Sequence, residues 1–416
     1  MKNYLSIILI ACSATFLLSQ TRFSNQDVFE IQYVKDPQIA PNNSQIVYVR
    51  TNMDIMTDSK TSSLWKISGD GTEHQKLTSS TANESSPRWS PDGKKIAFVS
   101  STDDENGSEI YVYWVESKQY SSISQLKQSP KNIRWSPDGK YIGFTMFVED
   151  DVLKLVSPPQ KPDNATWAPA PRITDRLKHE ADGSGYMEKG FHHLFMISSE
   201  GGTPIQVSSE SYNHQSFDWS KDSKKMIFTS NYSENWEYEF RNSEIYSIKV
   251  DGSDLKQLTD RNGPDRGPVV SPDGRTIAYL GYLDKVQTYQ VTKLYMMNID
   301  GSNKREIKTN LDRSISSLRW APDGKGVYFK YDNHGNGKIG YTSLSGKTKK
   351  IADNLGGTSI GRPYGGGSYS MSKTGKIVYT LSTPYHPADI GIFDGRKVQR
   401  ITNLNFDLLS NRDLVT

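Results

Sequence analysis

The stretch Arg88-Trp89-Ser90-Pro91-Asp92-Gly93-Lys94-Lys95-Ile96-Ala97-Phe98 decides the fold, because it predicts a strand, a tight turn and a second strand. Pro91 sets φ near about −65° in the turn, Asp92 tolerates the next position, and Gly93 supplies the left-handed residue that closes the hairpin. The phrase returns in two close copies and four looser ones, at 134–144, 319–324, 270–274, 219–223, 372–375 and 40–43.

The spacing of these copies predicts the architecture. They recur about every 50 residues, apart from one interval of 84 residues between Ser136 and Ser220. A hairpin repeated at that period is typical of a β-propeller or a solenoid, and four strand signals per repeat make one propeller blade. We therefore predict an all-β fold over residues 21–403, a seven-bladed β-propeller of four-stranded antiparallel blades, with an insertion at about 147–191 in the third blade.

Ring closure and loop lengths give two further expectations. The first and last repeats each contain their own four strands, so no strand remains to close the ring by exchange, and packing alone should hold it shut.

Turns on one face are short, whereas the other face should carry both chain ends and the long connections 101–108, 147–191, 231–242, 281–292 and 331–337. Function usually lies on the elaborated loops of a rigid scaffold, which predicts the working face there.

Residues 1–20 have the layout of a secretory signal peptide, because Lys2 precedes an apolar run from Tyr4 to Leu18 that is short for a membrane span. Leu9-Ile10-Ala11-Cys12 also matches a bacterial lipoprotein cleavage box, so a lipid anchor at Cys12 is the alternative. We expect an exported, periplasmic protein that meets a membrane only if Cys12 is lipidated. Cys12 is the only cysteine, which excludes disulfides and cysteine–zinc sites from the remainder.

Charge and motifs exclude several functions. The 50 basic and 47 acidic residues leave no basic field for nucleic acid. Gly357-Thr358-Ser359-Ile360-Gly361 matches a nucleophile elbow but lacks the strand before it and the helix after it. Ser345-Gly346-Lys347-Thr348 resembles the end of a phosphate loop, but Gly340 lies one residue too far away. His192 and His193 should face opposite sides of a strand and cannot bind one metal ion together. Taken together, these motifs lead us to predict no catalytic residue, cofactor or metal on this chain.

The candidate binding residues lie in and beside the insertion. The acidic runs Asp103-Asp104-Glu105 and Glu149-Asp150-Asp151 are ordinarily solvated loop charge, but either could dock a cationic group such as a peptide N-terminus. The insertion is alternatively a loop pinned by its own ion pairs, for example between Asp175 and a neighbouring arginine. The candidate substrate- or partner-binding residues are Glu149, Asp150, Asp175, Arg176, Asp182, Tyr186 and Arg362.

The repeated W-S-P-D-G-K-x-I-A-F phrase resembles the propeller repeats of the periplasmic protein TolB and of prolyl-oligopeptidase-family serine peptidases. Residues 174–178 and 182–186, with His193-Leu194-Phe195 and Gly201-Gly202, are similar to the third blade of the acylaminoacyl-peptidase-like branch. Residues 359–364 resemble the last blade of that branch, and 401–405 with Leu408-Leu409 resemble its exit into the catalytic domain.

This resemblance implies a propeller that acts as a lid and size filter, admitting short peptides to an α/β-hydrolase domain. No residue here matches the family's Ser, Asp and His triad. We expect a non-catalytic N-terminal propeller whose residues 404–416 lead toward a missing or separate hydrolase domain. Dipeptidyl-releasing relatives use a Glu pair, and no Glu-Glu occurs here, which argues against that specificity. The alternative is a self-standing TolB-like periplasmic propeller that binds proteins.

Overall fold

The structure is a computed structural model that describes residues 21–101, 107–150, 159–168, 173–359 and 366–414. The predicted signal peptide, the acidic run at 103–105, Asp151 and Arg362 lie outside the described residues. Within the described ranges, no helix has the length and apolar character needed to cross a membrane.

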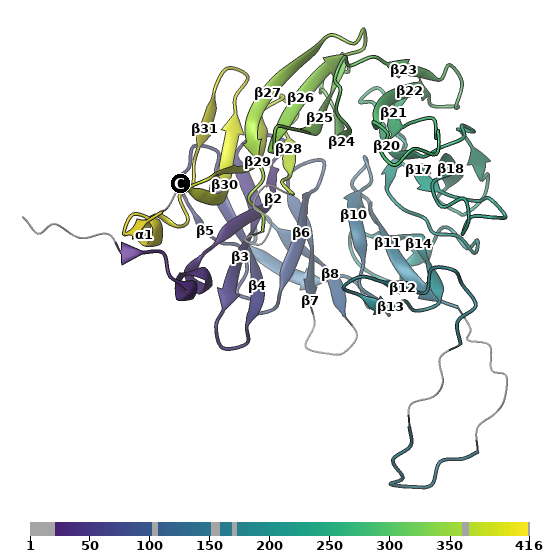
Figure 1. Ribbon diagram of the computed structural model, residues 1–416, viewed down its shortest axis with the longest axis horizontal. Coiled ribbons are helices and arrows are strands. Elements are labelled where there is room, and N and C mark those ends of the chain that lie inside the picture. Colours follow the sequence, from purple (N-terminus) through teal and green to yellow (C-terminus); the bar gives the residue numbers. More distant parts are fainter. Residues whose placement is uncertain (1–20, 102–106, 151–158, 169–172, 360–365, 415–416) are drawn as a thin grey trace, which may run out of the picture.

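Five four-stranded antiparallel sheets follow one another along the chain, and an eight-stranded sheet comes after them (Figure 1). Within each four-stranded sheet the strands pair in sequence order. The first two sheets contain β2 (Tyr33–Ile39), β3 (Gln45–Asp54), β4 (Ser59–Ser68) and β5 (Gln75–Lys76), then β6 (Glu84–Trp89), β7 (Lys95–Ser101), β8 (Ser108–Trp114) and β9 (Gln119–Ser122). The next three contain β10 (Lys131–Trp135), β11 (Tyr141–Glu149), β14 (Gly190–Ser198) and β15 (Ile205–Gln206), then β16 (Phe217–Trp219), β17 (Lys225–Ser230), β18 (Glu244–Lys249) and β19 (Lys256–Gln257), then β20 (Asp265–Val270), β21 (Thr276–Gly281), β22 (Lys293–Asn298) and β23 (Arg305–Ile307).

The eight-stranded sheet consists of two four-stranded halves. They contain β24 (Ile315–Trp320), β25 (Gly326–Asn333), β26 (Asn336–Ser343) and β27 (Thr348–Leu355), then β28 (Tyr369–Met371), β29 (Ile377–Thr383), β30 (His386–Phe393) and β31 (Val398–Arg400). Only the pair Leu355–Leu381 joins β27 to β29. Each half therefore has the strand order of the other sheets, and we call every such set of four strands a unit.

The first strands of the units surround the middle of the molecule, and hydrogen bonds connect each to the next (Figure 1). Four repeat tryptophans donate their indole N–H to the preceding unit: Trp89 to Gln38 O at 3.0 Å, Trp135 to Arg88 O at 2.9 Å, Trp219 to Arg134 O at 3.2 Å and Trp320 to Val269 O at 2.9 Å. The other junctions are Val270 N to Asp218 Oδ2 at 2.9 Å, Tyr369 OH to Ser317 O at 2.6 Å and Ile39 N to Ser370 Oγ at 2.9 Å. The last of these bonds joins the final unit to the first.

The quoted turn has the predicted geometry. Gly93 has a φ of +74°, in the left-handed region that glycine adopts without a steric penalty. Asp92 accepts hydrogen bonds from Ser90 Oγ at 2.6 Å and Lys94 N at 3.0 Å. The bond from Ser90 is the main reason why the pKa of the Asp92 carboxyl lies below its usual range. The side chains of this phrase therefore stabilise the turn that the phrase itself forms, so each copy specifies its hairpin locally.

The chain ends contact each other, which the sequence did not predict. Among the described residues the first and last units share no strand pairing, but β1 (Thr21–Arg22) pairs in parallel with β32 (Arg412–Asp413). Asp27, in the 3-10 helix η1 (Asn25–Glu30), accepts two hydrogen bonds from Arg412, at 2.8 and 2.7 Å. The short helix α1 (Phe406–Leu409) lies in the same contact (Figure 1). The prediction that the first and last units share no sheet is confirmed for the described residues, but packing is not alone in holding the ring shut, because strand pairing and an ion pair also join the chain ends.

Two predicted connections also differ. β25 and β26 continue to Asn333 and Asn336, so the loop expected at 331–337 shrinks to a turn at His334-Gly335. β11 and β14 pair as far as Glu149 and Gly190, which confines the insertion to 150–189. The described part of the insertion contains a small hairpin, β12 (Glu180–Ala181) and β13 (Gly185–Tyr186).

Candidate docking site on the loop face

The end of β11 and the start of β14 bring several predicted site residues together. Arg176 forms an ion pair with Asp150 at 3.0 Å, directly after β11. Asp175 forms an ion pair with Lys189, directly before β14. The hydrogen bond from Lys189 is the main reason why the pKa of Asp175 lies below its usual range. The insertion is therefore pinned by its own ion pairs, although Asp175 uses a lysine rather than the arginine that we expected.

Arg176 also fastens the insertion to the next unit. Its guanidinium donates to Gly190 O at 3.1 Å and lies 4.3 Å from the ring centre of Phe191 and 5.8 Å from that of Trp236. Trp236 lies in the connection between β17 and β18, and from the same connection Glu237 accepts a hydrogen bond from Leu177 N at 3.2 Å. The insertion is thus held against the loop of the following sheet.

A cavity of ≈ 350 Å³ opens where these two loops meet. Its walls combine three carboxylates, two cations and three aromatic rings, together with one serine: Asp175, Glu234, Glu237, Arg176, Lys189, Phe191, Trp236, Tyr212 and Ser211. Carboxylates beside an aromatic wall suit an ammonium group, since the ring face attracts a cation that the carboxylates can also bind. Lys189 already pairs with Asp175, so the lining carboxylates that make no ion pair with a described residue are Glu234 and Glu237.

The remaining predicted residues lie elsewhere. Glu149 is exposed and accepts a hydrogen bond from Gln128 Nε2 at 2.9 Å. Asp182 and Tyr186 lie on the exposed β12–β13 hairpin, and neither lines the cavity. The prediction missed Trp236 and its acidic neighbours. The sequence feature that could have indicated them is the alternation of acidic and aromatic residues in Glu234-Asn235-Trp236-Glu237-Tyr238-Glu239-Phe240.

Large apolar side chains are exposed on the connections between second and third strands of the units. Met56 is 88% exposed after β3, Tyr238 is 75% exposed after β17, and Val286 is 88% exposed after β21. Others on the same set of connections are Ile55, Leu177, Phe240, Leu283, Tyr289 and Tyr385. In an antiparallel sheet these connections all leave the same end of the strands, so the residues gather on one face of the molecule.

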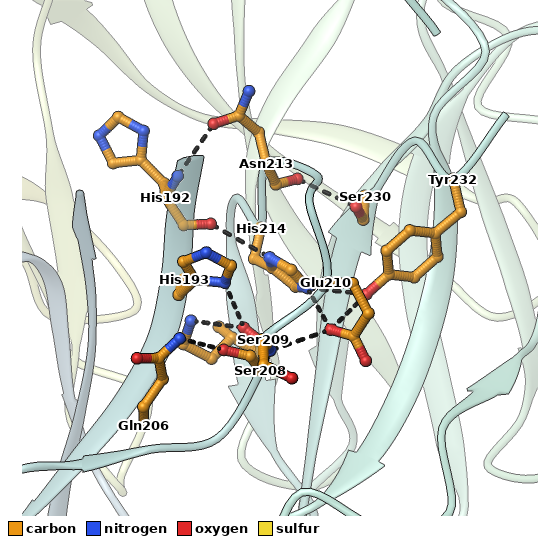
Figure 2. Close-up of polar contacts among 11 residues, drawn as sticks. His192, His193, Gln206, Ser208, Ser209, Glu210, Asn213, His214, Ser230 and Tyr232 are labelled. Carbon is orange, nitrogen blue, oxygen red and sulfur yellow. Dashed lines mark hydrogen bonds and ion pairs between the residues drawn. The ribbon is translucent and has the colours of Figure 1, made fainter. Parts of the chain in front are cut away.

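A buried polar cluster lies beside this site (Figure 2). His214 Nδ1 lies 3.1 Å from His192 O, and its Nε2 lies 2.7 Å from Tyr232 OH and 3.4 Å from Glu210 Oε2. The hydrogen bond from His214 lowers the pKa of Glu210 to about 2. Burial and the neighbouring His214 lower the pKa of His193 to about 4, so His193 is neutral at pH 7.

The Ser208–His193 pair in this cluster is structural. The two side chains lie 3.4 Å apart, but Ser208 is 1% exposed and His193 is 5% exposed, so no substrate reaches them. Other units pair a serine or threonine with a carboxylate at the same place: Ser124 with Glu109, Thr259 with Glu244 and Thr402 with Asp389. His193 replaces the carboxylate in a link that repeats around the molecule.

Ser359 lines a separate cavity of ≈ 210 Å³ beside the chain ends, and His386 lines the same cavity. No hydrogen bond joins the two side chains in the described structure. Nor do the described residues contain a group of three or more His, Cys, Asp or Glu side chains that could hold a metal ion.

Replacing Arg176 with alanine should loosen the insertion while leaving the sheets folded. The change removes the ion pair with Asp150 and the stacking on Phe191, worth roughly 1–2 kcal/mol together at a partly exposed site. Hydrogen exchange measured by mass spectrometry should show faster exchange at 175–190 and unchanged protection in β17. Asp182→Ala is the control, because Asp182 is exposed on the same insertion and makes no ion pair with a described residue. Equal exchange in both variants would contradict the role of Arg176.

Known proteins resemble this chain in sequence. Residues 163–284 match the family described as dipeptidyl peptidase IV (DPP IV) N-terminal region. Dipeptidyl-peptidase 5 of Porphyromonas gingivalis is 24% identical over 317 residues, which are 71% of this chain and 44% of that protein. Dipeptidyl-peptidase 5 of Arthroderma otae is 32% identical over 135 residues, 30% of this chain and 18% of that protein. The chain thus spans less than half the length of both relatives.

Solved structures resemble it in fold. Pyrococcus horikoshii acylaminoacyl peptidase matches with a TM-score of 0.70 at 17% identity, over 94% of this chain and 55% of that one. The β-propeller domain of the trilobed protease from Pyrococcus furiosus, described as having an open velcro topology, matches with a TM-score of 0.63 at 19% identity, over 91% of this chain and 98% of that one. The likeness to TolB from Acinetobacter baumannii is weaker, with a TM-score of 0.43.

Proposed function

The chain is a propeller domain of the prolyl-oligopeptidase family of serine peptidases, and on this premise we propose that it is the substrate gate and docking domain of an exported oligopeptidase. The peptidase would be of the dipeptidyl- or acylaminoacyl-releasing kind. The units arranged around the middle of the molecule would form seven blades, and the propeller itself would be non-catalytic. Residues 1–20, with their signal-peptide layout, support export to the periplasm.

The observation that carries this proposal is the apolar character of the loop face. Soluble proteins rarely expose many large apolar side chains together unless a partner covers them. Met56, Tyr238 and Val286 are each more than two-thirds exposed on that face, whereas the opposite ends of the sheets carry the polar Ser-Pro-Asp-Gly turns. A hydrolase domain seated on the loop face would bury these residues and restrict access to its own site to short peptides that pass the loops.

The cavity beside Arg176 supports peptide docking on the same face. Glu234 and Glu237, which make no ion pair with a described residue, provide negative charge beside the ring of Trp236, which suits the amino terminus of a short peptide. These separate carboxylates would hold the amino terminus of the peptide in place of the adjacent Glu-Glu pair that the sequence lacks. In this proposal the chain binds peptides and leaves the bond-breaking step to the hydrolase domain.

Fluorescence anisotropy of labelled peptides tests the proposal on the purified chain. We expect saturable binding of short peptides and exclusion of a labelled folded protein. Trp236→Ser, in the cavity beside Arg176, should weaken peptide binding by roughly 1 kcal/mol, or about fivefold. Leu255→Ser is the matched control, because Leu255 is an exposed apolar residue outside the loop face. Absence of peptide binding, or equal losses in both variants, would overturn the docking role.

The non-catalytic part of the proposal has its own assay. The purified chain should release no chromophore from dipeptidyl or acyl-peptide chromogenic substrates. Turnover that disappears in Ser359→Ala would show that the serine beside His386 is a nucleophile and would refute a purely docking domain.

A further inference from the structure

A second cavity, of ≈ 740 Å³, lies beside the docking cavity near Arg176. The side chain of Tyr212 lines both cavities, so the two are direct neighbours. The second cavity is lined by strands β18 and β19 and by the connections that flank the fourth unit, and it reaches the loop face at Asn231 to Ser233. Its volume is within the range of pockets that bind ligands. A peptide held beside Trp236 therefore has further binding space next to it.

The lining of this second cavity carries more negative than positive groups. Its charged residues are Glu210, Glu244, Asp260 and Arg261. Arg261 already forms an ion pair with Asp265, which lies outside the lining, and Asp260 pairs with a lysine of the next unit at 3.0 Å. The other two carboxylates make no ion pair with a lysine or arginine of the described chain, and only His214 lies near one of them, 3.4 Å from Glu210. The cavity therefore has negative charge that no permanent cation of the described residues neutralises.

Glu244 differs from the carboxylates that occupy the same place in other units. In the second unit, Glu109 accepts a hydrogen bond from a serine on one oxygen and from Leu126 N at 2.8 Å on the other. In the last unit, Asp389 accepts from a threonine and from Leu404 N at 3.1 Å. Glu244 accepts only from its threonine, through Oε2, and no described residue donates to Oε1. Because Glu244 is 5% exposed and lines the cavity, the fold leaves a buried acceptor there without a donor.

Aromatic rings form the wall beside these carboxylates. Tyr212 and Tyr232 pack edge to face with ring centres 4.8 Å apart, and Tyr232 and Tyr246 do so at 4.5 Å. Figure 2 shows Glu210 beside Tyr232, whose hydroxyl lies 3.4 Å from Glu210 Oε2. Ring faces attract a cation, and carboxylates accept its N–H groups in charge-assisted hydrogen bonds. The cavity therefore suits a group that brings both N–H donors and positive charge.

We propose that this second cavity binds the lysine or arginine side chain of a short peptide whose amino terminus lies in the neighbouring cavity beside Trp236. The inference rests on the proposed peptide docking and names its substrate class, peptides with a basic residue close to the amino terminus. The side chain of Tyr212 is a wall of both cavities, and an extended peptide advances by about 3.4 Å per residue. The basic residue therefore belongs at the second or third position of the peptide.

Short peptides with a free amino terminus and a fluorescent label at the other end test the site on the purified wild-type chain. They share one neutral sequence and carry either lysine or its uncharged isostere norleucine at the second, third or sixth position. One charge-assisted contact predicts about tenfold tighter binding of lysine than of norleucine at the second or third position, and no gain at the sixth. Equal binding of lysine and norleucine peptides, or the same gain at all three positions, overturns the basic-side-chain site and leaves the docking function standing. If none of the peptides binds, both proposals are wrong.

Glu244→Gln should remove most of the preference for lysine and leave binding of the norleucine peptides unchanged, a split that a merely structural role would not produce. The measurement is made at pH 8, because burial raises the pKa of Glu244 to about 7. Glu109→Gln is the matched control, since it changes the same kind of link in the second unit, and it should keep the full preference. Equal preference in both variants would overturn the assignment to this cavity. If Glu244→Gln does not fold, the wild-type comparison of lysine with norleucine still decides the question.

Discussion

Trp219→Ala should lower the free energy of unfolding by about 3–5 kcal/mol, the range observed when a large buried aromatic side chain is truncated. Trp219 is 2% exposed and packs in one cluster with Leu194 and Met196 of the preceding unit. A Cβ atom on Gly143 would lie 2.8 Å from the Trp219 ring, so the absence of a side chain at 143 is what admits the indole. The cavity left by the missing indole would lie between two sheets, and neither sheet can fill it without shifting against the other.

Urea unfolding followed by intrinsic fluorescence and by circular dichroism measures this loss. Trp219→Phe separates packing from hydrogen bonding, because it keeps a ring but loses the indole bond to Arg134 O, at a cost of about 1–2 kcal/mol. Trp167→Ala is the control, since Trp167 is 45% exposed in the insertion and its loss should change stability by less than about 0.5 kcal/mol. A Trp219→Ala variant as stable as the Trp167→Ala variant would refute the interlocking of units through their tryptophans.

The sequence contained enough information to predict the units, because each hairpin is specified locally. Pro91, Asp92 and Gly93 act within a few residues of one another, and the structure has the geometry that they dictate. The contact between Asp27 and Arg412 is different, because 385 residues separate them and no local pattern marks either. The β-bulge in β6 was also hidden, since Ser86 adopts a left-handed conformation that sequence analysis assigns first to glycine or asparagine.

The candidate site divides in the same way. The charged residues Asp175 and Arg176 stand out within one short segment, and the structure does place them together in one cavity. Their partners Lys189 and Trp236 come from β-strand ends and from the next unit, so only the folded arrangement of sheets brings them close. A propeller places ends of successive sheets on a common face, which is why single motifs reveal its scaffold better than its binding sites.

Glu244 should make the protein less stable as the pH rises from about 4.5 to 7. Burial raises the pKa of this carboxyl to about 7, despite the opposing hydrogen bond from Thr259. In the unfolded chain the same group ionises near pH 4.3, so over this window the unfolded state releases a proton that the folded state keeps. Stability therefore falls with rising pH, by about 2–3 kcal/mol in total after allowing for partial solvent screening.

The effect is isolated by comparing the wild type with Glu244→Gln in urea unfolding at pH 5 and at pH 8. Taking the difference in unfolding free energy between the two proteins removes the opposite contribution of His193. The lowered pKa of His193 makes the fold more stable as the pH rises from about 4 toward 6.5. Glu244→Gln should gain about 2–3 kcal/mol relative to the wild type at pH 8 compared with pH 5. Glu116→Gln, at an exposed turn, should follow the wild-type pH dependence. If Glu244→Gln also does so, Glu244 is ionised in the fold at neutral pH, and the threonine–carboxylate link between third and fourth strands accommodates a charge without cost.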